Sequence, residues 1–383
     1  MAIPFAQCVR IVRCLLAGIG VGIPAQAVHL VAPGSALPEI SSALAIAAPG
    51  DVIHVMPGTY APFAVGIGCT IRALASGVLV QSGATPASVT ISAPAGQTVH
   101  LVALGFSFPN GGNLVISNGR VTLDGCTITG RGALSSGNAP LRITNADAHL
   151  QGCTVTCTNQ FGFSPAVEAT GARITAIDSG FFGSPSTPTL FYVVSPAISA
   201  TSTTLHAAGC TIRAGVYGSG QVPGLSAGAG EVWLSDCTVV GYGACAIQGA
   251  AAVLADRCTL LPVGAPCQTP ATGGLLGVAR PQPLQNGAPF SLAYKTIPNS
   301  YAAVFASQEL ATLTIPGLHA QTQWLGGSIL NLGVVLADAT GTATGTWNIP
   351  AGSVFVDQQL WFQGLTGFAL PLQLSPVAGG VIR

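Results

Sequence analysis

The sequence predicts an all-β chain: a parallel β-helix solenoid with a short N-terminal capping helix, then a small C-terminal β-sandwich-like domain. Two observations predict it. A short phrase, Gly-Cys-Thr-Ile or a close variant, recurs at intervals of about 20 to 30 residues, the period of a solenoid turn. Charged residues make up 6% of the chain and hydrophobic residues 49%, which favours a folded β protein with Gly-rich turns over a disordered chain.

The N-terminus has the pattern of a secretory signal. Two arginines precede a short apolar run over 14–23, and a small-x-small sequence ends at Ala27. We therefore expect a signal peptide over 1–27, cleaved between Ala27 and Val28; the alternative is an ordinary buried segment. No second apolar stretch of about 20 residues follows, so no membrane span is expected. These features predict a secreted, cell-surface or periplasmic protein.

The first element expected after the signal is a short helix over 37–48. It ends at Pro49-Gly50, and a strand-like run follows at once. A helix in this place would cover the first turn of the solenoid, whose core and strand edges are otherwise exposed. Its apolar residues at helical spacing are Leu37, Ile40, Leu44, Ala47 and Ala48.

The repeats align on a cysteine: Cys126 and Cys153 lie 27 residues apart, as do Cys210 and Cys237. Side chains two positions apart share one face of a strand, so the cysteine is expected to point inward and the threonine after it outward. Stacked turns then form an internal structural ladder, which favours buried free thiols over a disulfide framework. The predicted ladder is Cys69, Cys126, Cys153, Cys210, Cys237 and Cys258, with Phe106 and Ser179 replacing cysteine in two turns.

Several phrases resemble a known family. The helical segment, the sequence Gly-Asp-x-Ile-x-Val-x-Pro-Gly-Thr-Tyr at 50–60 and the Gly-Cys-Thr-Ile turns resemble secreted bacterial right-handed parallel β-helix proteins with pectate-lyase-like repeats. The sequences at 338–344, 349–350 and 360–363 resemble the tail domains of many planctomycete-type secreted proteins. The resemblance implies a right-handed parallel β-helix, and none of these phrases is specific for an activity.

The repeat stops after Cys267. We assign 28–268 to the β-helix, the Pro- and Gly-rich segment 269–285 to a linker or cap, and 286–383 to the C-terminal domain. Short strands separated by turn residues fit a small β-sandwich; they are expected at 290–297, 302–306, 311–315, 334–337, 342–348, 359–363 and 371–374. The tryptophans of this domain are expected to fill its core, the alternative being that they stack on sugar rings: Trp324, Trp347 and Trp361.

Candidate site residues are few. Enzymes of this fold that act on uronic acids use clustered aspartates, and the lyases also use Ca²⁺ and an arginine base. Several aspartates here fall one or two residues before the cysteine position, where an Asp side chain bonds turn amides, so a structural role is expected and a Ca²⁺ site is the alternative. No catalytic, cofactor-binding or metal-binding residue is assigned. The polar candidates for a site are Asp124, Asp147, Arg142 and Asp178.

Two functions remain open. The first is a non-catalytic secreted or surface protein whose β-helix binds carbohydrate or a cell-envelope component. The second is a polysaccharide lyase or glycoside hydrolase acting on an acidic polysaccharide, which requires two carboxylates, or one carboxylate and Arg142 or Arg173, to converge on one outer groove. The formal net charge is zero, so the chain favours neither nucleic acid nor an anionic membrane as partner. The sequence gives no oligomeric state.

Overall fold

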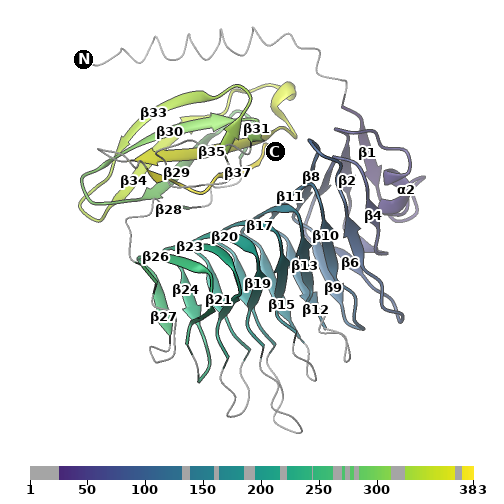
Figure 1. Cartoon of the computed structure of the whole chain (residues 1–383). Coiled ribbons are helices and arrows are strands. Elements are labelled where there is room, and N and C mark those ends of the chain that lie inside the picture. Colours follow the sequence, from purple (N-terminus) through teal and green to yellow (C-terminus); the bar gives the residue numbers. More distant parts are fainter. Residues whose placement is uncertain are drawn as a thin grey trace.

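Three long parallel sheets wind into a solenoid, and small antiparallel sheets form the C-terminal part of the chain (Figure 1). The computed structural model describes residues 26–131, 139–158, 164–184, 195–215, 222–243, 245–261, 270–271, 277–279, 284–311, 324–366 and 373–383. The predicted all-β fold and the parallel solenoid are confirmed. Most of the predicted signal peptide, 1–25, lies outside the described residues; Val28, after the expected cleavage point, begins the first strand.

Each complete turn of the solenoid contributes one strand to each of three sheets, here called A, B and C, which have 10, 9 and 8 strands. Sheet A contains β1 (Val28–Val31), β2 (Val52–Val55), β5 (Thr70–Ala73), β8 (Thr98–Val102), β11 (Arg120–Asp124), β14 (Asp147–Gln151), β17 (Arg173–Ile177), β20 (Thr203–Ala208), β23 (Gly230–Ser235) and β26 (Ala252–Asp256). Sheet B contains β3 (Gly58–Tyr60), β6 (Val78–Gln81), β9 (Gly105–Phe108), β12 (Thr127–Gly130), β15 (Thr154–Cys157), β18 (Gly180–Phe182), β21 (Thr211–Arg213), β24 (Thr238–Val240) and β27 (Thr259–Leu261). Sheet C contains β4 (Ala64–Val65), β7 (Val89–Ile91), β10 (Leu114–Ser117), β13 (Leu141–Thr144), β16 (Val167–Thr170), β19 (Ile198–Thr201), β22 (Leu225–Ala227) and β25 (Ile247–Gly249).

The corner between sheets A and B explains the recurring phrase. At the seven corners from β8–β9 to β26–β27 one residue has a left-handed backbone, with φ between 46° and 64°, which glycine adopts without strain and Asp or Asn tolerate. The cysteine follows, points into the core and donates its thiol to the carbonyl two residues earlier; Cys153 Sγ lies 3.5 Å from Gln151 O. Ser179 makes the same bond to Ile177 O at 2.9 Å. The corner residues are Ala103, Gly125, Gly152, Asp178, Gly209, Asp236 and Arg257.

The residue after the left-handed corner is therefore well suited to a small, buried side chain that donates a hydrogen bond, and cysteine is such a side chain. Cys126, Cys153, Cys210 and Cys237 are each 1% exposed. Burial, together with the neighbouring Cys153 thiol, holds the pKa of Cys126 well above its ordinary value, so this thiol stays protonated. The six cysteines of the predicted ladder are free thiols.

Two positions of the predicted ladder are wrong. Cys69 precedes β5 of sheet A, because Thr70 pairs with His100 of β8, so Cys69 lies at a different corner from the other cysteines. Gly105 pairs with Thr127, which places Leu104, rather than Phe106, opposite Cys126. The sequence Gly-Cys-Thr-Ile occurs both before a strand of sheet A and before strands of sheet B. In both places a bend is followed by a strand whose residues alternate between inward and outward.

The N-terminal end is covered by α2 (Ile40–Leu44), which is shorter than the helix predicted over 37–48. Ile40 and Ala43 are fully buried and join the solenoid core. Asp51 secures this cap: its carboxylate accepts from Ala48 N at 2.8 Å and Ala27 N at 2.9 Å and contacts His29 Nε2 at 3.0 Å. Burial alone would raise the pKa of Asp51, but these bonds outweigh burial and hold it below its ordinary value.

Two antiparallel sheets fit a separate C-terminal β domain. One contains β28 (Gly277–Val278), β29 (Pro289–Lys295) and β34 (Thr342–Asn348); the other contains β33 (Leu330–Leu336), β30 (Tyr301–Ser307), β35 (Gln359–Thr366), β36 (Gln373–Leu374) and β37 (Ala378–Val381). A short pair, β31 (Glu309–Ala311) and β32 (Trp324–Gly326), and the 3-10 helix η1 (Ser353–Phe355) complete it. The two sheets share one core, in which the Phe290 and Phe362 rings lie 4.8 Å apart. β28 lies within the segment predicted as a linker.

Candidate functional site

The outer face of sheet A carries a stack of charged residues and a stack of histidines. Every second side chain points outward, and parallel register stacks these side chains into columns. The first column holds Arg120, Asp147 and Arg173 on three successive strands. Arg173 Nη1 donates to both oxygens of Asp147, at 3.0 and 3.2 Å, and Arg120 Nη2 lies 4.0 Å from Asp147 Oδ2. This charged ladder carries two cations for one anion.

The middle column alternates histidine and threonine: His100, Thr122, His149, Thr175 and His206. His149 is 0% exposed, although it faces out of the sheet. Its ring meets Trp361 of β35 edge to face, at a centroid distance of 4.8 Å. Burial lowers the pKa of His100, His149 and His206 to about 4, and the neighbouring Arg120 and Arg173 act in the same direction on His100 and His206. The column is therefore neutral near pH 7.

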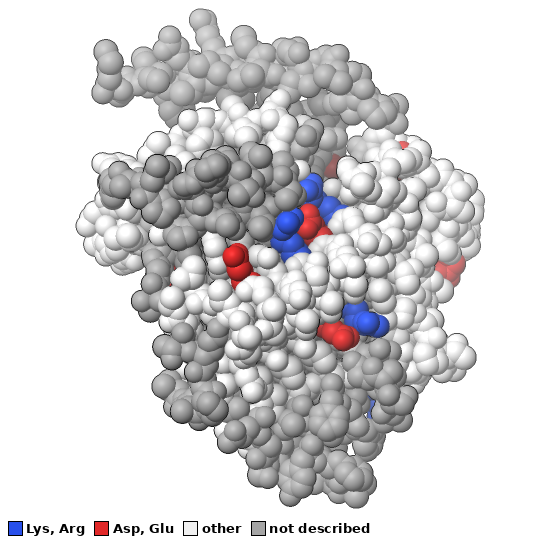
Figure 2. All heavy atoms as spheres, in the orientation of Figure 1, with Lys and Arg blue, Asp and Glu red and all other residues white. Residues whose placement is uncertain are grey.

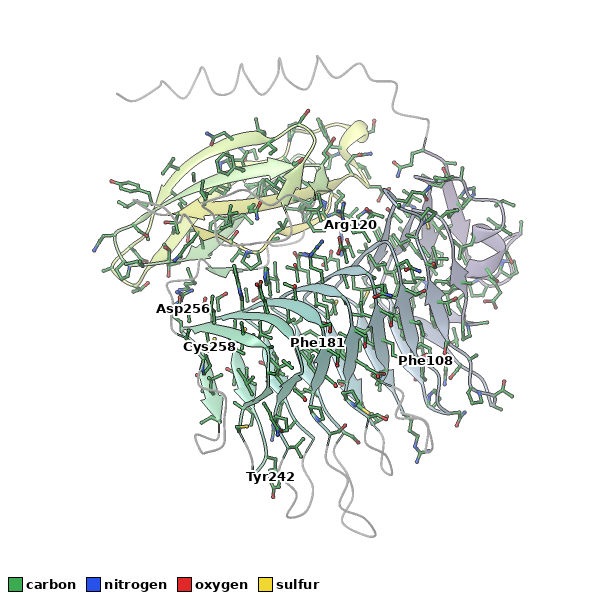
Figure 3. The ribbon with its side chains drawn as sticks, in the orientation of Figure 1. Phe108, Arg120, Phe181, Tyr242, Asp256 and Cys258 are labelled. Carbon is green, nitrogen blue, oxygen red and sulfur yellow. The ribbon has the colours of Figure 1, made fainter. Side chains whose placement is uncertain are left out.

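The C-terminal domain covers this part of sheet A (Figure 1). Gln151, at the end of β14, pairs with the backbone of Gly379: its Oε1 accepts from Gly379 N at 2.9 Å and its Nε2 donates to Gly379 O. Arg120 Nη1 donates to Leu310 O at 2.7 Å, and Figure 3 shows Arg120 where sheet A faces the domain. The blue and red atoms at the centre of Figure 2 gather at the same boundary.

A second charged contact lies nearer the N-terminal end. Asp357 accepts from Arg72 and lies 3.2 Å from His54 Nε2, and both partners come from sheet A. Burial would raise the pKa of Asp357, but His54 and Arg72 together hold it below its ordinary value. These contacts join the C-terminal domain to sheet A at a second point.

The four predicted polar candidates lie in different places. Asp147 belongs to the charged ladder; Asp124 is 7% exposed and faces out of sheet A beside Gln151. Arg142 pairs with Glu168 on sheet C, at 3.2 Å. Asp178 is a corner residue with φ of 46°. Asp147 and Arg173 do converge, as the enzyme hypothesis requires, whereas Arg142 does not join them.

The remaining solenoid acids are also spread out. Arg257 bonds both oxygens of Asp236 at 3.0 Å and also contacts Asp256, at the C-terminal end of the stack, where Figure 3 labels Asp256. Asp51 lies at the opposite end. Among the residues that the structure describes, no group of three or more His, Cys, Asp or Glu side chains is placed to hold a metal ion.

Sheet B has a different outer face, rich in hydroxyls. Its outward threonines stack in register on successive turns, interrupted at β18 by Gly180. A Cβ on Gly180 would lie 2.6 Å from the Phe182 ring, so this ring lies over the glycine, within the threonine row. Over the described strands of this face Arg213 is the one charged residue. The threonines are Thr127, Thr154, Thr211, Thr238 and Thr259.

Sequence reasoning missed the histidine column and Phe182. A signal was present: His149 and His206 both lie four residues before a ladder cysteine, where other turns carry Thr, Trp or Leu. Phe182 lies three residues after Ser179, in the place of Thr129 and Thr156. Reading these positions down the aligned repeats would have shown both columns.

No protein-family model matches the chain, and no characterised protein with which it was compared shows significant similarity. In the described ranges no helix is long and apolar enough to cross a membrane.

Proposed function

We propose that this chain is a non-catalytic secreted or cell-surface protein that binds a polysaccharide or another cell-envelope component on the outer face of sheet B. The observation that carries the proposal is the row of stacked threonines with Phe182 set into it. Hydroxyls at the strand spacing of about 4.8 Å can bond sugar hydroxyls at regular intervals along a polymer. An aromatic ring offers an apolar face to a sugar ring.

The charge distribution supports a neutral ligand. Most acids of the described solenoid are already bonded within the protein, as Asp51, Asp236 and Glu168 illustrate. Sheet B itself carries little charge, so an anionic polymer would find few partners there. Secretion and membership of the pectate-lyase-like β-helix proteins, with a planctomycete-type tail, belong to the same proposal and rest on the N-terminal pattern and the phrases at 50–60 and 338–344.

The test is binding of the full chain to neutral and acidic polysaccharides by affinity electrophoresis. Phe182→Ala is expected to weaken binding to the best neutral polymer about tenfold, because one stacked ring is lost. The matched control is Tyr301→Ala, which removes an aromatic ring that is 54% exposed on the C-terminal domain. Equal binding by wild type and Phe182→Ala, or equal losses in the two variants, would reject sheet B as the binding face.

A second candidate is a lyase or hydrolase acting on an acidic polysaccharide, favoured by the Asp147–Arg173 pair. If it is correct, incubation with acidic polysaccharides gives turnover, and Asp147→Asn lowers the rate at least about 100-fold because an acid-base group is lost. Glu168→Gln is the matched control, since it breaks a similar ion pair on sheet C. Absence of turnover in the wild-type chain removes this candidate.

A further inference from the structure

We propose that the C-terminal domain is held on sheet A by a pH-sensitive latch, in which protonation of His100 and His149 releases the domain and uncovers the charged ladder. The inference does not depend on the proposed ligand. It rests on where these two rings lie and on what faces them.

The geometry leaves no place for a second proton on His149. Neither ring nitrogen has a partner at hydrogen-bond geometry, and the ring is fully buried against Trp361. The Gln151 side chain acts to raise the pKa of His149, but burial outweighs it. His100, two strands away, also has an unpartnered buried Nδ1 and lies 6.5 Å from Trp361. An imidazolium left in this position would be a buried charge without a counter-ion, which is strongly unfavourable.

The charged groups near the two rings lie on neighbouring strands of sheet A and on the C-terminal domain. Arg120 and Asp124 lie on β11, Asp147 on β14 and Arg173 on β17. Asp147 is already bonded to Arg173. From the C-terminal domain, β35 and β37 contain no ionisable residue, and β31 carries Glu309 next to the Leu310 carbonyl that Arg120 binds. Arg120 nevertheless opposes protonation of His100, because it lowers the pKa of that ring in the same direction as burial does.

The direction of the pH effect follows from linkage. In the docked state the pKa of each histidine is about 4, and in the undocked state it returns to its ordinary value of 6.5. Docking is thus at full strength above pH 6.5 and is lost progressively as the pH falls toward 4. Relative to neutral pH, protonation of each histidine at about pH 5 raises the equilibrium constant for release of the domain about 30-fold, and protonation of the pair raises it about 1,000-fold.

Asp357 provides a matched control because it does not titrate in the same way. Its pKa is already held below the ordinary 3.8, so the carboxylate stays ionised over the window in which the histidines protonate. Asp357→Asn is expected to weaken docking while the release caused by protonation of His100 and His149 remains. Replacing both His100 and His149 is expected to remove the pH dependence instead.

The experiment is small-angle X-ray scattering of the full chain from neutral pH down to about pH 4.5, with far-ultraviolet circular dichroism on the same samples. We expect the maximum dimension of the wild type to increase within this range while its β signal stays constant. The double variant His100→Phe/His149→Phe is expected to stay docked throughout. The same double replacement by glutamine, which cannot be protonated either, covers the case in which the phenylalanine variant fails to fold.

Three results would overturn the proposal. The first is a wild-type particle that keeps its dimensions down to the lowest pH. The second is release of the double variants at the same pH as the wild type. The third is loss of the β signal in step with the expansion, because the domain would then be unfolding rather than separating intact.

Discussion

Replacing Phe181 by alanine is expected to lower the free energy of unfolding by about 3–5 kcal/mol. Phe181, labelled in Figure 3, is 2% exposed and points into the solenoid core from β18. Val155 and Ile212 occupy the same place on the turns before and after it. Backbone bonds such as Gly180 N to Cys153 O, at 2.8 Å, fix the distance between turns. The turns therefore cannot collapse into the space that the ring leaves, and most of the cavity cost remains.

The matched control is the next residue. Phe182 has the same chemistry on the same strand but points outward, so Phe182→Ala is expected to cost less than about 1 kcal/mol. Urea unfolding followed by circular dichroism measures both. Phe181→Ala is expected to lose stability and keep polysaccharide binding. Phe182→Ala is expected to keep stability and lose polysaccharide binding. Similar stability losses in the two variants would mean that β18 does not have the register described.

The solenoid could be predicted from the repeat because most turns have the same kind of corner between sheets A and B, and therefore similar residues at it. At most of these corners the left-handed residue is glycine or aspartate, and a buried cysteine or serine that donates to a carbonyl follows it. Ala103-Leu104 departs from this pattern. Gly125-Cys126 and Asp178-Ser179 form the same corner with different residue types. The phrase does not say which corner it marks, and Cys69 was placed on the wrong one for that reason.

The candidate site was less predictable because it depends on contacts between distant parts of the chain. Gln151 and Gly379 are 228 residues apart, and no local pattern in either segment indicates that they meet. Trp361 lies, as expected, in a buried cluster of its own domain with Leu310, Leu325 and Val377, and its contact with His149 of the solenoid is what the sequence did not indicate. Asp147 could be selected as an acid, but its Arg120 and Arg173 partners emerge only from the register of three strands.

Gly230→Ala is expected to destabilise the C-terminal end of the solenoid by about 3–5 kcal/mol, because two costs add. Gly230 has φ of 108°, a conformation that side chains rarely adopt. A Cβ at this position would also lie 2.2 Å from Thr203 O, a backbone atom of the preceding turn. The chain must therefore shift β20 against β23, and the pairing of these two strands is disturbed at its first residue.

Gly96→Ala separates the cost of backbone strain from the cost of the steric clash. Gly96 also has a positive φ, 79°, but nothing lies within 4 Å of the Cβ position, so only the backbone strain of about 1–2 kcal/mol is expected. Urea midpoints give the difference, and hydrogen exchange locates it. Because turns of a solenoid stabilise only their neighbours, faster exchange in Gly230→Ala should be confined to β20, β23 and β26. Exchange that rises uniformly along sheet A would show that the solenoid unfolds as one unit, and the nearest-neighbour account of its stability would then be wrong.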